Sequence, residues 1–340
     1  LNAQLLRQLR RPSKNTESAQ QKTPENVEVQ ALNKRFDEAI ELLKNTKFAQ
    51  SQDKAWLGRF SQQHVYQLPW YMFIGAPGSG KTTALVNAGL TFPLADTFGK
   101  TALKGVGGTR NCDWWFTDEA VLLDTAGRYT THESDPKGDE EEWTGFLSLL
   151  SKYRGRQPIN GIILTISLAD LLSANDTDRI QHAAVLRQRL GELKKQLGIH
   201  FPVYVLVTKM DLLTGFEPYF SSFDRSSLEQ VWGFSFAYEQ SQQASFDLLG
   251  QYQQEFARLQ QRLDDGLADV LAQTATEEQR AKAFLLPQQF ESIQDLLGYF
   301  LTEVFASSKF EPGVSPRGVY FSSGTQGGMG FDPVTAQLGQ

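Results

Sequence analysis

The segment that most constrains this chain is Gly75-Ala-Pro-Gly-Ser-Gly-Lys-Thr82, which follows a short apolar run and opens a stretch of helical pattern. Its glycines let backbone N–H groups converge on an anion at a helix N-terminus. The lysine reaches phosphate oxygens, and the final threonine can ligate Mg²⁺. The segment predicts a loop that binds a nucleoside triphosphate with Mg²⁺, with contacts from Gly75, Ala76, Pro77, Gly78, Ser79, Gly80, Lys81, Thr82 and Thr83.

Composition excludes several other classes of protein. The 340 residues are 40% apolar and 21% charged, as in globular domains, and the net charge of −6 argues against a nucleic-acid surface spread over the chain. The longest apolar run, Gly161–Leu172, is shorter than the ~20 residues that span a bilayer. The single cysteine, Cys112, cannot form an internal disulfide and is interpreted as a buried structural residue. Because the chain opens at Leu1, we expect it to be part of a longer protein.

Short β-rich apolar runs alternate with helical patterns through the first two thirds of the chain. The runs are Trp70–Gly75, Val121–Asp124, Gly161–Leu168 and Val203–Thr208, and the clearest helix between them is Asp176–Leu197. A further strand is expected through Trp114 and Phe116, with one of the paired tryptophans in the core and the other exposed or under a helix. This alternation predicts an α/β fold, a mostly parallel sheet with flanking helices.

The pattern also suggests how the chain is divided. Residues 1–67 are predicted as an N-terminal helical extension and linker, and 68–215 as the phosphate-loop domain, completed by 312–328. After Leu213 we expect no strand before Gly318–Phe321, so 216–311 is predicted as an α-helical insertion, with helices around 246–271 and 293–305. Residues 329–340 form a tail.

Asp124-Thr-Ala-Gly127 follows the second apolar run directly. A carboxylate that ends a strand beside a phosphate loop can hold Mg²⁺, and the Gly127 amide can sense a γ-phosphate. The alternative is a generic turn. The preceding glycine-rich segment contains Thr109, a candidate switch residue and Mg²⁺ ligand, or else part of a turn. Where many GTPases place a water-orienting glutamine, this chain has Arg128, which predicts that hydrolysis is slow or depends on another residue or a partner. Arg128 and Arg110 could stabilise charge in the reaction or have a plain surface role.

The segment Thr208-Lys-Met-Asp211 lies at the end of a predicted strand and is expected to select the base of the nucleotide. The Asp211 carboxylate can accept from the N1–H and amino group of guanine, whereas adenine presents an acceptor at N1. Lys209 is expected to pack along the base, and the loop Ser322-Ser-Gly-Thr325, through Ser323 and Gly324, to close over the guanine oxygen. We therefore favour GTP over ATP, although Thr208 stands where asparagine is commoner.

Several longer segments resemble the cytoplasmic region of the IcmF/TssM family of type VI secretion: Leu68-Pro-Trp-Tyr71, Asn87-Ala-Gly-Leu-Thr-Phe-Pro-Leu94, Gly108-Thr-Arg-Asn-Cys-Asp-Trp-Trp115, Asp124-Thr-Ala-Gly-Arg-Tyr129 and Arg317-Gly-Val-Tyr-Phe-Ser-Ser-Gly-Thr-Gln326. The resemblance implies a P-loop GTPase-like domain on the cytoplasmic face of the bacterial inner membrane, anchored by transmembrane segments outside this chain. It further implies self-association and assembly with TssL, TssJ and the baseplate.

Two hypotheses follow. In the first, the chain is a slow, regulated NTPase whose segments 105–111 and 124–139 order on a γ-phosphate. In the second, it is a scaffold that works through protein contacts, with nucleotide turnover absent or incidental.

Overall fold

The computed structural model describes residues 33, 34, 37, 41, 66, 68–86, 112–117, 119–130, 136–228, 230–241, 243, 245–307 and 314–324. The predictions for Thr109, for Arg110 and for the tail at 329–340 lie outside the described residues. So does most of the predicted N-terminal extension.

The described strands form one seven-stranded sheet in the order β2-β3-β1-β4-β5-β7-β6. Strands β3, β1, β4, β5 and β7 are parallel to one another, and β2 and β6 are antiparallel to their neighbours. The predicted mostly parallel α/β sheet is therefore confirmed. The strands are β1 Trp70–Ile74, β2 Cys112–Phe116, β3 Val121–Thr125, β4 Gly161–Ser167, β5 Val203–Thr208, β6 Gly233–Ser235 and β7 Pro316–Phe321.

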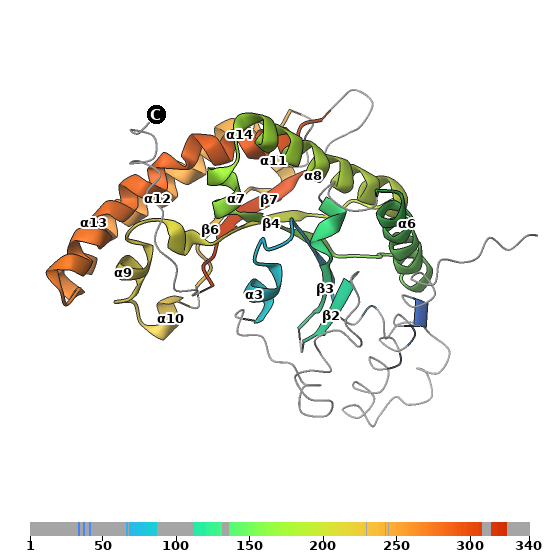
Figure 1. The fold of residues 1–340 in the computed structure, drawn as a ribbon, viewed down its shortest axis with the longest axis horizontal. Coiled ribbons are helices and arrows are strands. Elements are labelled where there is room, and N and C mark those ends of the chain that lie inside the picture. Colours follow the sequence, from blue (N-terminus) through green and yellow to red (C-terminus); the bar gives the residue numbers. More distant parts are fainter. Residues whose placement is uncertain are drawn as a thin grey trace, which may run out of the picture.

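Helices flank both faces of the sheet (Figure 1). Helices α6, α8 and α14 run over one face, α3 lies on the other, and α12 and α13 extend beyond the β6 edge. The α-helices are α3 Lys81–Val86, α6 Pro136–Tyr153, α7 Leu168–Ser173, α8 Asp176–Leu197, α9 Phe216–Phe220, α10 Arg225–Leu228, α11 Tyr238–Ser241, α12 Leu248–Gln273, α13 Glu277–Ser292 and α14 Gln294–Val304. Two 3₁₀ turns, η3 Gly127–Thr130 and η4 Met210–Leu212, follow β3 and β5.

The alternation of side chains across β2 places its two tryptophans in different cores. Trp114 lies in the large core under α6 and α8, where its ring meets that of Trp70 edge-on at 5.3 Å. Trp115 belongs to a small cluster that includes Leu85 of α3. The expectation of one core tryptophan and one under a helix is confirmed. Cys112, at the start of the same strand, is buried as predicted.

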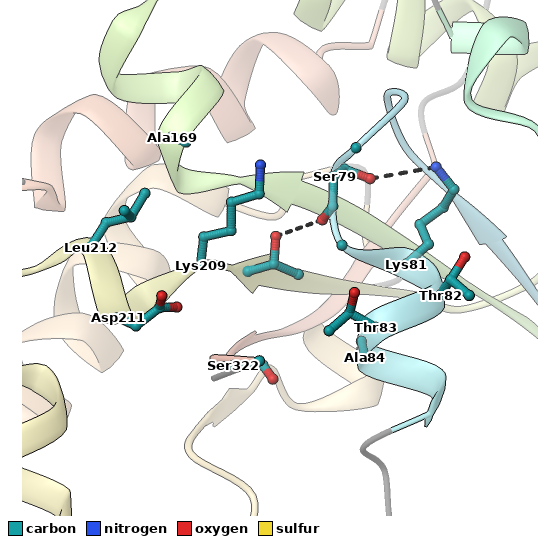
Figure 2. Close-up of a pocket in the computed structure, with 14 residues that line it drawn as sticks. Ser79, Lys81, Thr82, Thr83, Ala84, Ala169, Lys209, Asp211, Leu212 and Ser322 are labelled. Carbon is teal, nitrogen blue, oxygen red and sulfur yellow. Dashed lines mark hydrogen bonds between the residues drawn. The ribbon is translucent and has the colours of Figure 1, made fainter. Parts of the chain in front are cut away.

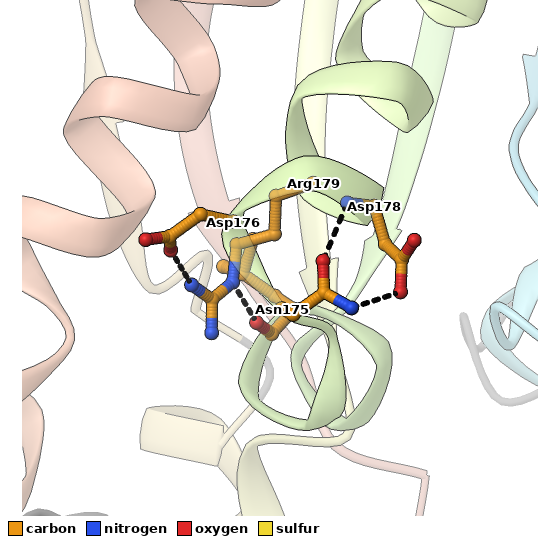
Figure 3. Close-up of polar contacts among 5 residues, drawn as sticks. Asn175, Asp176, Asp178 and Arg179 are labelled. Carbon is orange, nitrogen blue, oxygen red and sulfur yellow. Dashed lines mark hydrogen bonds and ion pairs between the residues drawn. The ribbon is translucent and has the colours of Figure 1, made fainter.

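Helix α8 begins and ends at the predicted residues because both ends carry capping signals (Figure 3). The Asn175 side chain accepts from the amide of Asp178 at 2.9 Å, and Arg179 pairs with Asp176 at 2.6 Å. Arg179 also donates to the Leu171 carbonyl of α7 at 2.8 Å. At the other end, Gly198 has φ of 63°, a left-handed conformation that glycine adopts without strain.

The region from 216 to 311 departs from its prediction in two ways. It contains a strand, β6, which the sequence did not reveal because three residues are too few to show alternation. It also contains α13, whose interior Pro287 disguised the helical pattern. The helices pack directly on the sheet, since Phe256 of α12 stacks on Phe290 of α13 at 4.3 Å, and Phe290 meets Phe321 of β7 at 5.1 Å.

Over the described ranges, none of the helices has both the length and the apolar character that crossing a bilayer requires.

Candidate nucleotide-binding site

The predicted phosphate loop connects β1 to α3 at the carboxyl edge of the parallel strands, where α/β sheets bind ligands. Gly78 and Gly80 have φ of 70° and 84°, which other residues adopt only with strain. Gly75 is required for a different reason, because a Cβ there would lie 2.2 Å from Thr165 Oγ1. The glycines therefore allow a tight loop that lies against β4.

Two threonines from neighbouring strands hold the loop in place. Thr165 of β4 donates to the Ile74 carbonyl at 3.0 Å, and its hydroxyl lies 3.2 Å from that of Ser79. Thr208 of β5 donates to the Ser79 carbonyl at 2.6 Å. Both threonines are buried. Thr165 is not among the residues predicted for the site. The one available signal was a hydroxyl residue in the middle of an apolar strand.

Lys81 lies inside the curve of the loop and is only 7% exposed. Its ammonium group donates to the carbonyls of Gly75 at 2.7 Å and Ala76 at 2.9 Å, and lies 3.5 Å from the Ser79 hydroxyl. Burial lowers the pKa of Lys81, and the charge of Asp124 opposes that shift. Two of the three N–H groups thus position the side chain, and the third has only a long contact, so it is available to a phosphate oxygen.

Asp124 is the penultimate residue of β3 and lies beside the first turn of α3. Its Oδ2 accepts from the Thr82 hydroxyl at 2.7 Å, whereas its buried Oδ1 has no hydrogen-bond partner among the described residues. Burial raises the pKa of Asp124, and the Thr82 bond and Lys81 partly offset the rise. An unpartnered buried carboxylate oxygen beside a hydroxyl suits a hard cation such as Mg²⁺.

No cluster of three or more His, Cys, Asp or Glu side chains that could hold a metal occurs in the part of the chain that the structure describes. This agrees with the chemistry of Mg²⁺ in phosphate-loop sites, where one or two protein oxygens suffice because phosphates and water supply the other ligands. Thr82 and Asp124 therefore fit the predicted metal.

The turn after β3 lies against the phosphate loop. A Cβ on Gly127 would lie 2.3 Å from the backbone nitrogen of Pro77, so only glycine fits at this position. Thr130 donates to the Gly127 carbonyl at 2.7 Å and closes the turn. Arg128 follows in η3, but its side chain lies outside the described residues.

Asp211 and Ser323 meet at the other end of the site. Ser323 donates to Asp211 Oδ1 at 2.5 Å, so the carboxylate is fixed by the loop after β7. Main-chain bonds join the two segments as well: the Ser322 amide donates to the Val207 carbonyl at 2.8 Å, and the Met210 amide donates to the Ser322 carbonyl at 3.2 Å. Lys209 has φ of 61°, which is unusual for a residue with a side chain. Such a conformation persists because the residues on both sides are held.

These segments border one cavity of about 560 Å³ (Figure 2). The phosphate-loop side chains lie along one side, and Lys209, Asp211 and Leu212 lie along the other. Six other predicted site residues do not line the cavity: Gly75, Ala76, Pro77, Asp124, Gly127 and Ser323. The predicted residues that line the cavity are Gly78, Ser79, Gly80, Lys81, Thr82, Thr83, Thr208, Lys209, Asp211, Ser322 and Gly324, and they are joined by Ala84, Ala169 and Leu212, which the sequence did not indicate.

Solved structures similar to this chain include a GTP-binding protein from Sulfolobus solfataricus in complex with GDP. It is 14% identical with a TM-score of 0.25, over 56% of this chain and 51% of that one. Another is the signal recognition particle receptor SRb-GTP/SRX complex from Chaetomium thermophilum, 17% identical with a TM-score of 0.30, over 80% of this chain and 97% of that one. Because these scores are low, the fold assignment depends on the strand order and the phosphate loop of the chain itself.

The sequence model of the IcmF-related N-terminal domain family matches residues 136–340, which is more than half of the chain. The chain is also 47% identical over 313 residues to the type VI secretion system component TssM1 of Pseudomonas aeruginosa. That match covers 92% of this chain but only 28% of the relative. The chain belongs to the IcmF/TssM family.

Proposed function

We propose that this chain is the nucleotide-binding domain of a type VI secretion component, and that it binds GTP in preference to ATP, together with Mg²⁺, and hydrolyses it slowly. The observation that carries the proposal is one cavity with a lysine-bearing phosphate loop on one side and the fixed Asp211 carboxylate on the other. A nucleoside triphosphate needs both groups, because its phosphates would bind the loop and its purine would bind the carboxylate.

At the phosphate end, the chain supplies converging amides, the Lys81 ammonium and a helix N-terminus. When bound, Mg²⁺ would neutralise phosphate charge, and Thr82 and Asp124 are the residues that would hold it. Gly127 lies directly against Pro77 of the loop, so its amide is well placed to respond to a terminal phosphate.

At the base end, Asp211 favours guanine. A carboxylate accepts the N1–H and the 2-amino group of guanine, whereas the unprotonated N1 of adenine would be repelled. Two charge-assisted bonds at roughly 1.5 kcal/mol each correspond to about a hundredfold preference. The bond from Ser323 holds the carboxylate before the ligand arrives, which lowers the entropic cost of binding.

Hydrolysis should be slow, because position 128 offers arginine where a glutamine would orient water. Slow turnover suits a regulatory domain. A γ-phosphate bound against the turn after β3 would alter the contacts of that turn within a secretion complex. By family resemblance, that complex lies at the cytoplasmic face of the inner membrane, and its other members are TssL, TssJ, baseplate proteins and further copies of the chain.

Single-turnover assays with radiolabelled GTP and ATP test the enzymatic part of this proposal. We expect phosphate release from GTP at no more than about 10⁻⁴ per second, below the intrinsic rate of a GTPase that keeps the water-orienting glutamine, and slower release from ATP. Intact GTP after many such periods, both with the chain alone and with reconstituted membrane partners, would favour a scaffold instead.

A further inference from the structure

The Thr208 hydroxyl lies between the two halves of the proposed site. Thr208 is the last residue of β5 and is buried. Its hydroxyl donates to the Ser79 carbonyl of the phosphate loop at 2.6 Å, and its other acceptor among the described residues is the Ile166 carbonyl at 3.3 Å. A threonine hydroxyl carries one proton, so that proton is used within the protein.

The segment after Thr208 is therefore fixed from two sides. Thr208 ties it to the phosphate loop, and the Ser323–Asp211 bond ties it to the loop after β7. The Thr208 side chain also lies close to the Gly80 backbone of the phosphate loop, since a Cβ at Gly80 would lie 3.4 Å from it. Displacing the phosphate loop would move the base-binding segment with it.

This arrangement limits what the site can read on a purine. The N7 atom on the imidazole side of guanine or adenine accepts hydrogen bonds and needs a donor. An asparagine has a side-chain NH₂ group with two N–H donors, so it could donate one hydrogen bond to the phosphate loop and another to N7. Threonine cannot, because donation to the Ser79 carbonyl leaves its oxygen only as an acceptor.

We propose that Thr208 is a positioning residue that joins the phosphate loop to the base-binding segment, and that the site consequently recognises guanine through its Watson–Crick edge without reading N7. This inference rests on the proposed function, because it concerns how the same cavity binds its ligand. Recognition then depends on Asp211 and on main-chain groups of residues 322–324.

Guanine analogues test which atoms are read. In calorimetric titrations of the unmodified chain with Mg²⁺, 7-deaza-GTP should bind within about twofold of GTP, since it lacks only N7. Inosine triphosphate lacks the 2-amino group and should bind about tenfold more weakly, the loss expected for one charge-assisted bond. A loss of about tenfold or more with 7-deaza-GTP would overturn the inference. Absence of binding by GTP itself would overturn the proposed function as well.

Variants test the positioning role. Thr208→Val keeps the shape of the side chain and should weaken GTP and 7-deaza-GTP equally, by about tenfold, because it leaves the Ser79 carbonyl without its donor. Thr208→Ser keeps the hydroxyl and should restore most of the affinity. Thr302→Val is the matched control, since it removes a similar bond to the Gly298 carbonyl within α14. The role is refuted if Thr208→Val binds GTP normally, or if Thr208→Ser folds but binds as weakly as Thr208→Val.

Discussion

Replacing Lys81 with methionine is expected to weaken the binding of Mg²⁺–GTP by about a hundredfold, because a charge-assisted contact to phosphate contributes roughly 1.5–3 kcal/mol per bond. The effect on the nucleotide-free protein should be small. Methionine loses the bonds to the Gly75 and Ala76 carbonyls, but it also removes a buried ammonium group whose pKa is lowered by desolvation. These two contributions oppose each other.

Calorimetry and thermal unfolding together check this expectation. Lys195→Met is a matched control, since Lys195 is exposed near the end of α8, away from the cavity. The control should bind GTP like the unmodified chain, and Lys81→Met should unfold within a few degrees of it. If folded Lys81→Met kept its affinity for GTP, the phosphate loop would not be the binding site.

Replacing Asp211 with asparagine is expected to reverse the choice of base. The side-chain amide loses an acceptor for the 2-amino group of guanine and gains a donor for the 2-oxo group of xanthine. Affinity for GTP should fall by about a hundredfold, the contribution of two charge-assisted bonds, and xanthosine triphosphate should become the better ligand. Ser323 can still donate to the remaining carbonyl oxygen, so the loop contact is retained.

Competition against a fluorescent GTP analogue measures this reversal. Asp269→Asn, at an exposed position of α12, is the control for loss of a surface charge. If Asp211→Asn left the affinities for GTP and ATP unchanged, the carboxylate would not contact the base, and the preference for GTP would have no structural support.

The elements around the cavity could be predicted because their signals are local. A strand end followed by a turn is indicated at the phosphate loop by glycines at 75, 78 and 80 with a lysine and a threonine at fixed spacing. The apolar runs before Asp124 and Asp211 indicate the same arrangement. Since carboxyl ends of parallel strands meet at one edge, the sequence also implied that these turns converge. The structure brings them together around one cavity.

Long-range contacts were beyond the reach of sequence reasoning. Ser79 is hydrogen-bonded to Thr165, 86 positions away, and to Thr208, 129 positions away. No local sequence pattern indicates such long-range pairs. Thr208 illustrates the limit best. From the sequence it was predicted as a nucleotide-binding residue that stands where asparagine is commoner, and the structure shows its hydroxyl bonded to the Ser79 carbonyl. Likewise, β6 is recognised only through its pairing with β7.

We propose that the cavity between the phosphate loop and Asp211 binds a guanine nucleotide with Mg²⁺. Calorimetric titration of the chain with GTPγS and with ATPγS, each with Mg²⁺ and with EDTA, tests it directly. We expect one GTPγS per chain, binding of ATPγS that is weaker by about a hundredfold, and a marked loss of affinity without Mg²⁺. Equal affinity for both nucleotides would contradict the role of Asp211, and no heat of binding or thermal protection by either would contradict the claim as a whole.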